Sequence, residues 1–259
     1  MSRKYETRKN KVLSLLNEKG TLSNAELAEL FDLSPASVRR FSAELAEDDS
    51  VIRIRGGLRI APHAEPNYSF DSQSQEYTEE KHRIAELACR YVRDDQIIFL
   101  ESGTTVYQCA LALASRIRSS SLKNITIFTN SLNNLYALSP VCKVMLVGGE
   151  YRAERSDFVG YLCERFLRTF CFDHVFLGLD AISACGDLMA MDFDTACICE
   201  TLLQHANSVT VVAHSAKFSK NSLLPFASLD DVARVVTDSD LSDEEFRRYS
   251  VYSAELLRA

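Results

Sequence analysis

The sequence predicts two domains: a small N-terminal domain of the all-α class that ends in a short β-wing, and a larger α/β domain with an open, largely parallel sheet. Helical periodicity with capping signals fills the first 45 residues, whereas six short apolar runs, separated mostly by helical patterns, follow residue 79. The charge also changes sign between the two parts. Residues 1–60 carry 11 lysines and arginines against 9 aspartates and glutamates, and residues 61–259 carry 18 against 27.

The chain of 259 residues has a net charge of −7, which taken whole argues against a nucleic-acid partner. Divided between the two parts, the charge is +2 in the first sixty residues and −9 in the remainder. A content of 46% hydrophobic and 25% charged residues excludes a chain too polar to fold. The composition therefore leaves room for a small nucleic-acid-binding module attached to an acidic body.

Three helices are predicted in the N-terminal domain. Apolar residues recur at helical spacing between Arg8 and Leu16, which indicates the first helix. Ser23 and Glu26 have the spacing of a capping box, which predicts a second helix through Phe31. After a two-residue turn, Ser34 is expected to be the N-cap of a third helix with proline at its first position.

A ribbon that alternates apolar residues with arginine follows over 51–58 and turns near two glycines. Helix, capped helix, tight turn, arginine-bearing helix and basic ribbon together predict a winged helix-turn-helix about Leu22 to Phe41, whose third helix enters the major groove of double-stranded DNA. The alternative is a three-helix bundle that makes protein contacts. The residues expected at the DNA are Ser34, Ser37, Arg39, Arg40, Arg53 and Arg55.

The expected boundaries follow from composition. Residues 1–60 form the DNA-binding domain, and the polar stretch 61–78, with two prolines and a serine- and glutamine-rich run, is interpreted as a linker. Residues 79–240 form the α/β domain, and 241–259 a C-terminal helical tail. The six apolar runs predicted as strands are 96–100, 125–128, 143–147, 174–177, 208–213 and 232–236. They lack polar alternation, which is typical of a parallel sheet covered on both faces.

Small and polar segments follow five of these strands. Open α/β sheets bind ligands at the carboxyl ends of their strands, and a loop that leads into a helix offers backbone N–H groups to an anion. We therefore expect a phosphorylated small molecule near the first of these loops, with Lys217 supplying an opposite charge. The residues expected at this effector are Glu101, Ser102, Gly103, Thr104, Thr105, Asn130, Ser131, Gly148, Gly149 and Lys217.

These motifs resemble the DeoR-type family of sugar-responsive transcriptional regulators over residues from about 5 to about 240. Arg53 to Gly57 is similar to the family's Arg-x-x-Gly-Gly wing, and Glu101 to Thr105 is similar to its Asp-Ser-Gly-Thr-Thr phosphate loop. Thr129-Asn130-Ser131 matches outright, as does Val147-Gly148-Gly149, and His214 to Lys217 is similar to Asp-Ser-Ser-Lys. The resemblance implies a sensor fold like ribose-phosphate isomerases and coenzyme A transferases, used as a receptor for sugar phosphates, and an effector-controlled repressor that is usually oligomeric.

The sequence departs from the family pattern at four places. Glu101 and His214 replace aspartates, and Cys199 falls where the family often has lysine. These changes alter one cation and one acid near the expected ligand. In the third helix, the segment over 37–42 reads Ser-Val-Arg-Arg-Phe-Ser instead of the family's Thr-Ile-Arg-Arg-Asp-Leu, which shifts an apolar position.

The leading hypothesis is a DNA-binding regulator of carbohydrate genes, without a cofactor and not an enzyme. A module of only +2 binds DNA weakly by charge alone, so we expect a homo-oligomer that pairs two or more modules. The alternative is an isomerase-like enzyme for sugar phosphates that carries a helical appendage. Its general base would come from Glu101, Asp180, Asp187 or His214.

The eight cysteines all lie beyond residue 88 and form no Cys-x-x-Cys pair, so we interpret them as small buried hydrophobic residues. A third hypothesis is a redox regulator that uses Cys197 and Cys199. No metal site is expected. The polar N-terminus does not have the apolar run of a signal peptide, and no stretch reaches the ~20 apolar residues of a membrane helix. We therefore expect a cytoplasmic protein with no membrane association.

Overall fold

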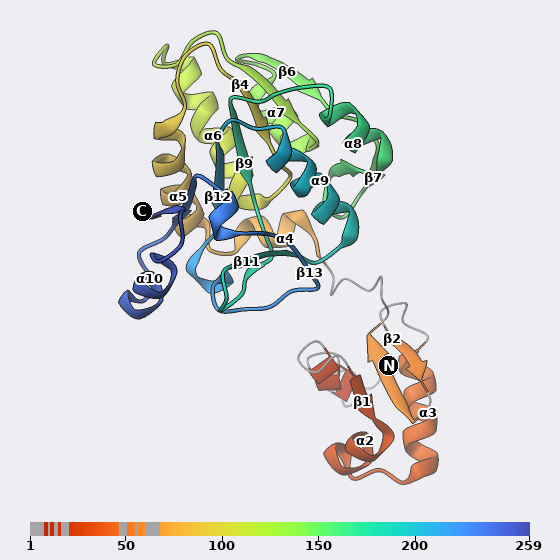
Figure 1. The fold of residues 1–259 in the computed structure, drawn as a ribbon. Helices are drawn as coiled ribbons and strands as arrows, with labels where there is room; N and C mark the ends of the chain where they lie inside the picture. The colour runs from red at the N-terminus through yellow and green to blue at the C-terminus, as the bar shows by residue number, and fades with distance from the viewer. Residues whose placement is uncertain are drawn as a thin grey trace. The chain divides into compact units, whose positions relative to one another are not determined.

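The computed structural model describes residues 8–9, 11–12, 15–16, 21–46, 51–54, 56–60 and 68–259. The chain divides into two compact units, Met1–Tyr68 and Ser69–Ala259. Figure 1 labels the helices and strands of both units.

The second and third predicted helices of the first unit begin where the sequence predicts them. Residues 8–9, 11–12 and 15–16 are helical. Ser23 caps α2 with both halves of a capping box: the Glu26 N–H donates to Ser23 Oγ at 3.2 Å, and the Ser23 N–H donates to the Glu26 carboxylate at 2.8 Å. Ser34 caps α3, which begins at Pro35. The elements of this unit are β1 (Thr21–Ser23), α2 (Asn24–Phe31), α3 (Pro35–Leu45), β2 (Val51–Ile54) and β3 (Gly57–Ile60).

The predicted wing is present, and β1 adds a third strand to it. The strands run antiparallel in the order β1-β3-β2. Gly56 has a φ of +91°, and a Cβ at Gly57 would lie 2.1 Å from the Leu22 carbonyl oxygen. The two glycines are therefore needed for the turn and for the close approach of β3 to β1.

The shifted apolar position in α3 has a structural explanation. Phe41 and Ser42 are both buried, and the Phe41 ring meets Phe31 edge-on, with centroids 5.9 Å apart. Phe41, which occupies the family's aspartate position, thus contributes to the core in this chain. The leucine position holds Ser42, whose hydroxyl has no hydrogen-bond partner. The core of this unit also includes Val12, Leu16, Leu22, Leu27, Val38, Leu45, Val51 and Leu58.

The second unit contains the predicted open parallel sheet, which confirms the fold class. Seven strands lie in the order β15-β14-β12-β9-β4-β5-β6, and every neighbouring pair is parallel. All six predicted strands are present. The seven are β4 (Ile97–Leu100), β5 (Thr126–Thr129), β6 (Lys143–Leu146), β9 (His174–Leu177), β12 (Val209–Val212), β14 (Arg234–Thr237) and β15 (Glu255–Arg258).

Alternate residues of each strand face opposite sides of this sheet, and each side has its own core. Ile98 joins the cluster that contains Leu113 of α6, whereas Phe99 joins the one that contains Leu202 of α9. Helices thus cover both faces. One face carries α5 (Thr78–Ala88), α6 (Thr104–Arg118) and α7 (Leu132–Leu138), and the other carries α8 (Tyr161–Leu167) and α9 (Phe193–Gln204).

Shorter elements complete the second unit. An antiparallel hairpin joins β7 (Glu150–Arg152) to β8 (Asp157–Val159), and a small sheet has the order β10 (Ala181–Ile182), β11 (Asp187–Ala190), β13 (Leu224–Ser228). The remaining elements are α4 (Phe70–Gln75), α10 (Asp243–Tyr249) and the 3₁₀ turns η1 (Cys89–Tyr91), η2 (Ser215–Lys217) and η3 (Leu229–Asp231). None of the helices in the described ranges combines the length and the apolar character needed to cross a bilayer.

The predicted linker over 61–78 is wrong in its second half. Helix α4 lies there and belongs to the second unit, because Phe70 is buried and its ring meets Tyr107 of α6 edge-on, at 5.6 Å between centroids. One buried aromatic among polar residues anchors this helix, and a single apolar residue produces no period in the sequence. The part over 61–67, with both prolines, lies outside the described residues.

The predicted helical tail over 241–259 is correct for α10 and wrong for β15. Residues 255–258 pair in parallel with β14 and form the edge strand of the main sheet. Leu256 packs on the face covered by α9, and Leu257 packs on the face covered by α6. Two consecutive leucines fit a helix or a strand equally well in a sequence, and the unpaired edge of β14 decides between them.

Candidate DNA-binding and effector sites

The predicted DNA-contacting residues lie at the start of α3 and on the wing. Ser34 Oγ accepts the Ser37 N–H at 3.3 Å and lies 3.0 Å from Ser37 Oγ, so these two serines hold each other at the helix N-terminus. Arg39, Arg40 and Arg53 are exposed, and Arg55 lies outside the described residues.

The Arg40 guanidinium is 81% exposed and lies 3.8 Å from the Glu44 carboxylate. An exposed pair of this kind contributes about 0.3–0.5 kcal/mol. The Arg40 side chain can therefore leave Glu44 for a phosphate or a base edge at little cost.

The predicted effector loops lie at one edge of the main sheet, because the strands that precede them are all parallel. Contacts between loops link them directly. Asn134 Nδ2 donates to the Glu101 carbonyl at 2.9 Å, and the Gly178 N–H donates to the Glu101 carboxyl at 3.3 Å. Asn130 Nδ2 donates to the Phe158 carbonyl at 3.0 Å, while Asn130 Oδ1 is buried without a partner. The loops that meet here cover 101–105, 129–131, 178–180 and 214–217.

Not every predicted residue is available to a ligand. A Cβ at Gly149 would lie 2.2 Å from the Val159 carbonyl oxygen, so this glycine is required by the β7–β8 hairpin. Gly148 has open space around its Cα. Ser131 caps α7, where its Oγ accepts the Asn134 N–H at 3.4 Å.

The N-terminus of α6, which follows the first predicted effector loop, has no side-chain cap. Its N-cap residue is Gly103, and no side chain caps the helix. The amides of its first turn, which begins at Thr104 and Thr105, point beyond the helix end, where the helix dipole favours negative charge. A helix of 15 residues with a side-chain-free N-cap suits a phosphate group.

Cations lie at the same sheet edge. Burial lowers the pKa of Lys217, and Lys220 and Arg155 lower it further, whereas Asp180 raises it. Burial also lowers the pKa of Lys81 to about 8, with Lys217 adding to the effect. Lys81 Nζ donates to the Gln73 carbonyl of α4 at 2.6 Å. The mutual repulsion of these cations would be relieved by a bound anion.

His214, which replaces the family's aspartate, faces these lysines. Burial, Lys217 and Lys81 together lower its pKa to about 4, so the imidazole is neutral at pH 7. Its ring stacks on Tyr77 with centroids 4.3 Å apart, and its Nδ1 is buried without a partner. A neutral ring thus stands where an aspartate would add negative charge.

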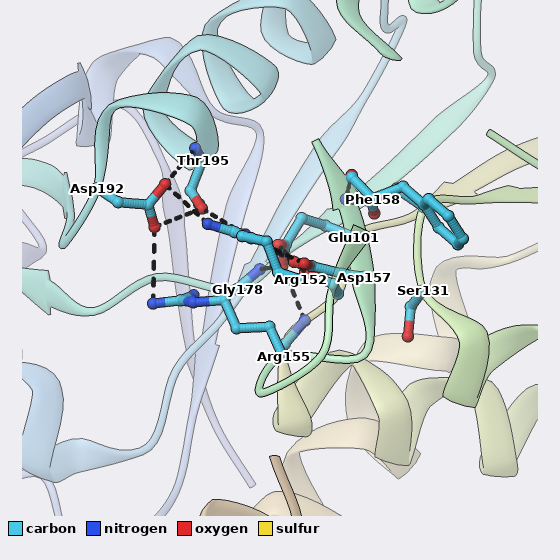
Figure 2. A network of polar contacts seen from close by, with 12 residues as sticks. Glu101, Ser131, Arg152, Arg155, Asp157, Phe158, Gly178, Asp192 and Thr195 are labelled. Carbon is cyan, nitrogen blue, oxygen red and sulfur yellow. Dashed lines mark hydrogen bonds and ion pairs between the residues drawn. The ribbon is translucent and has the colours of Figure 1, made fainter. Parts of the chain in front are cut away.

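Figure 2 shows a buried network beside the effector loops that sequence reasoning missed. Arg152 donates to both oxygens of Asp157, at 2.9 and 2.7 Å, and its Nη1 lies 2.9 Å from the Asp192 carboxylate. Asp192 caps α9 by accepting the Thr195 N–H at 2.8 Å, and Arg155 lies 3.6 Å from its second oxygen. Burial opposes ionisation of Asp192, but Arg152 and the Thr195 N–H lower its pKa overall.

This network joins the β7–β8 hairpin, α9 and the first effector loop, since Ser102 Oγ lies 2.7 Å from the Asp157 carboxylate. Two of its members, Ser102 and Thr195, are 93 residues apart in the chain. The only signal in the sequence is the alternation of opposite charges over 152–157, directly after the Gly-Gly segment. Charge alternation alone is more typical of a solvated surface.

The hypothesis of a redox regulator that uses Cys197 and Cys199 has little structural support. Cys199 is buried and Cys197 is only partly buried, so the two side chains face different surroundings on α9. Burial raises the pKa of both thiols, and nearby acids raise each further. All eight cysteines lie in the described part of the chain and are free thiols, and Cys171 and Cys185 are exposed, against the expectation of burial. No group of His, Cys, Asp and Glu among the described residues is arranged to hold a metal ion.

Taken together, the two units define a class of protein: a transcriptional regulator with a winged helix-turn-helix followed by a ligand-sensing α/β domain. The family model of the DeoR-like helix-turn-helix domain matches residues 8–63, and that of the DeoR C terminal sensor domain matches residues 76–239. The chain therefore belongs to the DeoR family.

Curated relatives match nearly the whole chain. The chain is 29% identical over 238 residues to the glycerol-3-phosphate regulon repressor of Escherichia coli (strain K12), covering 91% of this chain and 92% of that protein. It is 31% identical over 233 residues to the HTH-type transcriptional repressor CsqR of the same organism, covering 89% and 87%. Ribose 5-phosphate isomerase from Plasmodium falciparum is similar in structure, with a TM-score of 0.42 and 16% identity over 55% of this chain and 54% of that one.

Proposed function

We propose that this protein is a cytoplasmic repressor of carbohydrate-metabolism genes, and that a phosphorylated sugar bound to its sensor domain controls its grip on operator DNA. The observation that carries the proposal is the convergence of four strand-end loops, the side-chain-free N-terminus of α6 and two lysines at one sheet edge. A relative whose name is the lactose phosphotransferase system repressor of Lactococcus lactis supports the same reading, at 28% identity over 252 residues, covering 96% of this chain and 97% of that protein.

In the DNA-bound protein, α3 lies in the major groove with its N-terminus toward the bases. Ser37, Arg39 and Arg40 are placed to contact base edges or phosphates, and Arg53 on the wing is placed to contact the flanking backbone. Ser34 acts mainly as the cap that orients this helix terminus.

In the sensor domain, the phosphate accepts hydrogen bonds from the first amides of α6 and from the hydroxyls of Thr104 and Thr105. Lys217 approaches from the loop after β12 and balances the phosphate charge. Asn130, whose Oδ1 has no partner, accepts a hydrogen bond from a sugar hydroxyl.

Lys217→Ala tests the sensor. We expect operator binding to remain, while the effector concentration for half-maximal response rises at least about tenfold, because a charge-assisted contact is lost. The measurement is fluorescence anisotropy of promoter DNA in the presence of a panel of sugar phosphates. Lys220→Ala is the matched control, since Lys220 lies three residues away and is exposed. An unchanged response in Lys217→Ala would remove this lysine from the site.

We further propose that two copies of the chain associate through α8. The second copy then supplies the second DNA-binding module. Tyr161 and Leu162, two neighbouring large apolar residues of α8, are 71% and 66% exposed. A cleft of about 290 Å³ beside them is lined by Tyr161, Glu164, Arg165 and Arg168. A surface that carries both an acid and arginines around an apolar centre can pair with itself about a two-fold axis.

Sedimentation equilibrium tests this interface. Arg165→Glu places like charges opposite each other across the axis and should shift the protein toward monomer. The double variant Glu164→Arg, Arg165→Glu restores opposite charges and should restore association. Leu162→Ser should also shift the protein toward monomer. Its control Tyr136→Ser should not, because Tyr136 is 70% exposed on α7, over the opposite sheet face. Wild-type protein that is monomeric at micromolar concentration would contradict the proposal.

A further inference from the structure

At the first effector loop, the Ser102 hydroxyl contacts the carboxyl groups of both Glu101 and Asp157. If both carboxyls are ionised, the three side chains have only one hydrogen for these two hydrogen bonds. Ser102 Oγ lies 2.8 Å from Glu101 Oε1 and 2.7 Å from Asp157 Oδ2. None of the three side chains is more than 5% exposed. A hydroxyl has one hydrogen and can donate it to one acceptor only. The second contact therefore needs a hydrogen that comes from a carboxyl group.

The other contacts decide which carboxyl carries it. Arg152 donates to both oxygens of Asp157, a bidentate pair that stabilises the ionised carboxylate. On Glu101, the Gly103 and Gly178 N–H groups both donate to Oε2, at 3.0 and 3.3 Å. This leaves Oε1, the oxygen beside Ser102, to hold a hydrogen.

The charged and titratable groups around Glu101 come from three elements. Asp157 and Arg155 belong to the β7–β8 hairpin and Cys199 belongs to α9. Asp180, in the loop after β9, acts on the same Cys199. Burial raises the pKa of Glu101, the Ser102 hydrogen bonds and Arg155 oppose this, and Asp157 adds to it. Cys199 is itself buried, and its pKa is raised, so it supplies no charge to this pocket at neutral pH.

We propose that Glu101 is a neutral carboxylic acid in the folded protein, and that its proton makes anion binding at α6 dependent on pH. Its Oε1–H donates to Ser102 Oγ, and the Ser102 hydroxyl donates to Asp157. Ionisation of Glu101 would place a negative charge against Gly103, the N-cap of the helix that receives the anion. The proposal rests on the proposed function for the place where the anion binds.

The protonation state is tested first, without any ligand. Glu101→Gln is isosteric with the neutral acid, since an amide can donate to Ser102 and accept from the two backbone N–H groups. The infrared difference spectrum of wild type minus Glu101→Gln at neutral pH should contain the carbonyl band of a protonated carboxyl. Glu150→Gln, an exposed glutamate in the next hairpin, should give only a carboxylate band. A carboxylate band at Glu101 would overturn the proposal.

The pH dependence of stability is a second test of the protonation state of Glu101. When folding raises the pKa of a glutamate, the folded protein loses stability as the pH rises from the unfolded-state pKa through the folded-state pKa. Wild type should show this loss, and Glu101→Gln should not. A pH profile of wild type that coincides with that of Glu101→Gln would count against the neutral acid.

Anion binding is then measured with sulfate, whose own charge does not change in the pH range where a glutamate of raised pKa ionises. Wild-type affinity for sulfate should fall about tenfold as Glu101 ionises, and Glu101→Gln should have a flat profile. A pH-independent wild-type affinity would overturn the linkage to binding. If sulfate binds neither protein, the anion site at α6 is wrong, whereas the infrared result still decides the state of Glu101.

Discussion

The arginines of the two domains have opposite surroundings. In the DNA-binding domain, Arg40 is 81% exposed and shares a single long contact of 3.8 Å with Glu44. In the sensor domain, the Arg152 side chain is 14% exposed and makes contacts of 2.7–2.9 Å with two aspartates. The first arrangement leaves a cation available to a partner, and the second uses a cation to fix the shape of a site. The same residue type is therefore exposed and weakly paired in one domain, and buried in a structural network in the other.

The largest expected effect comes from disrupting the buried ion pairs of Arg152. Asp157→Asn leaves Arg152 partly uncompensated and should lower the free energy of unfolding of the sensor domain by about 3–5 kcal/mol. Urea denaturation followed by circular dichroism measures it. The control is Glu244→Gln, which removes the exposed partner of Arg248 at 3.6 Å and should change stability by less than about 0.5 kcal/mol. Equal losses of stability in the two variants would contradict the distinction between the buried and the exposed arginine pairs.

The exposed side should show its effect in binding instead of stability. Arg40→Ala should weaken operator binding by about 1–3 kcal/mol if the arginine contacts a base, with the unfolding transition unchanged. Fluorescence anisotropy of promoter DNA at two salt concentrations measures the loss, and a smaller salt slope would indicate a phosphate contact. Arg248→Ala is the control, because this arginine is also exposed in a pair four residues apart. Unchanged DNA affinity in Arg40→Ala would contradict the proposed placement of α3 in the major groove.

The smallest expected effects compare two serines of α3 and have opposite signs. Ser34→Ala removes the N-cap and should cost about 1 kcal/mol of stability. Ser42→Ala removes a buried hydroxyl that has no partner and should stabilise the domain by about 1 kcal/mol. Thermal denaturation of the two variants beside wild type gives both values. A loss of stability in Ser42→Ala would show that this hydroxyl makes a useful contact.

Local sequence signals were sufficient for much of this protein. The capping serines at Ser23 and Ser34 begin their helices as expected, because a cap depends only on residues within one turn. The six predicted strands are also present, since a strand buried on both faces must be continuously apolar. Helix α4 and strand β15 could not be read in this way, because one buried Phe70 and one pair of leucines carry no period.

By itself, the sequence determined the order of the two domains, the open parallel sheet and the loops that end at one of its edges, including Ser102 to Thr105. Only the tertiary structure decided what surrounds those loops. The ion pairs of Arg152 and the hydrogen bonds of Glu101 depend on groups up to 77 residues apart that meet in a buried, low-dielectric place. Pairing and protonation there follow from distances between atoms, which residue types and their spacing do not contain.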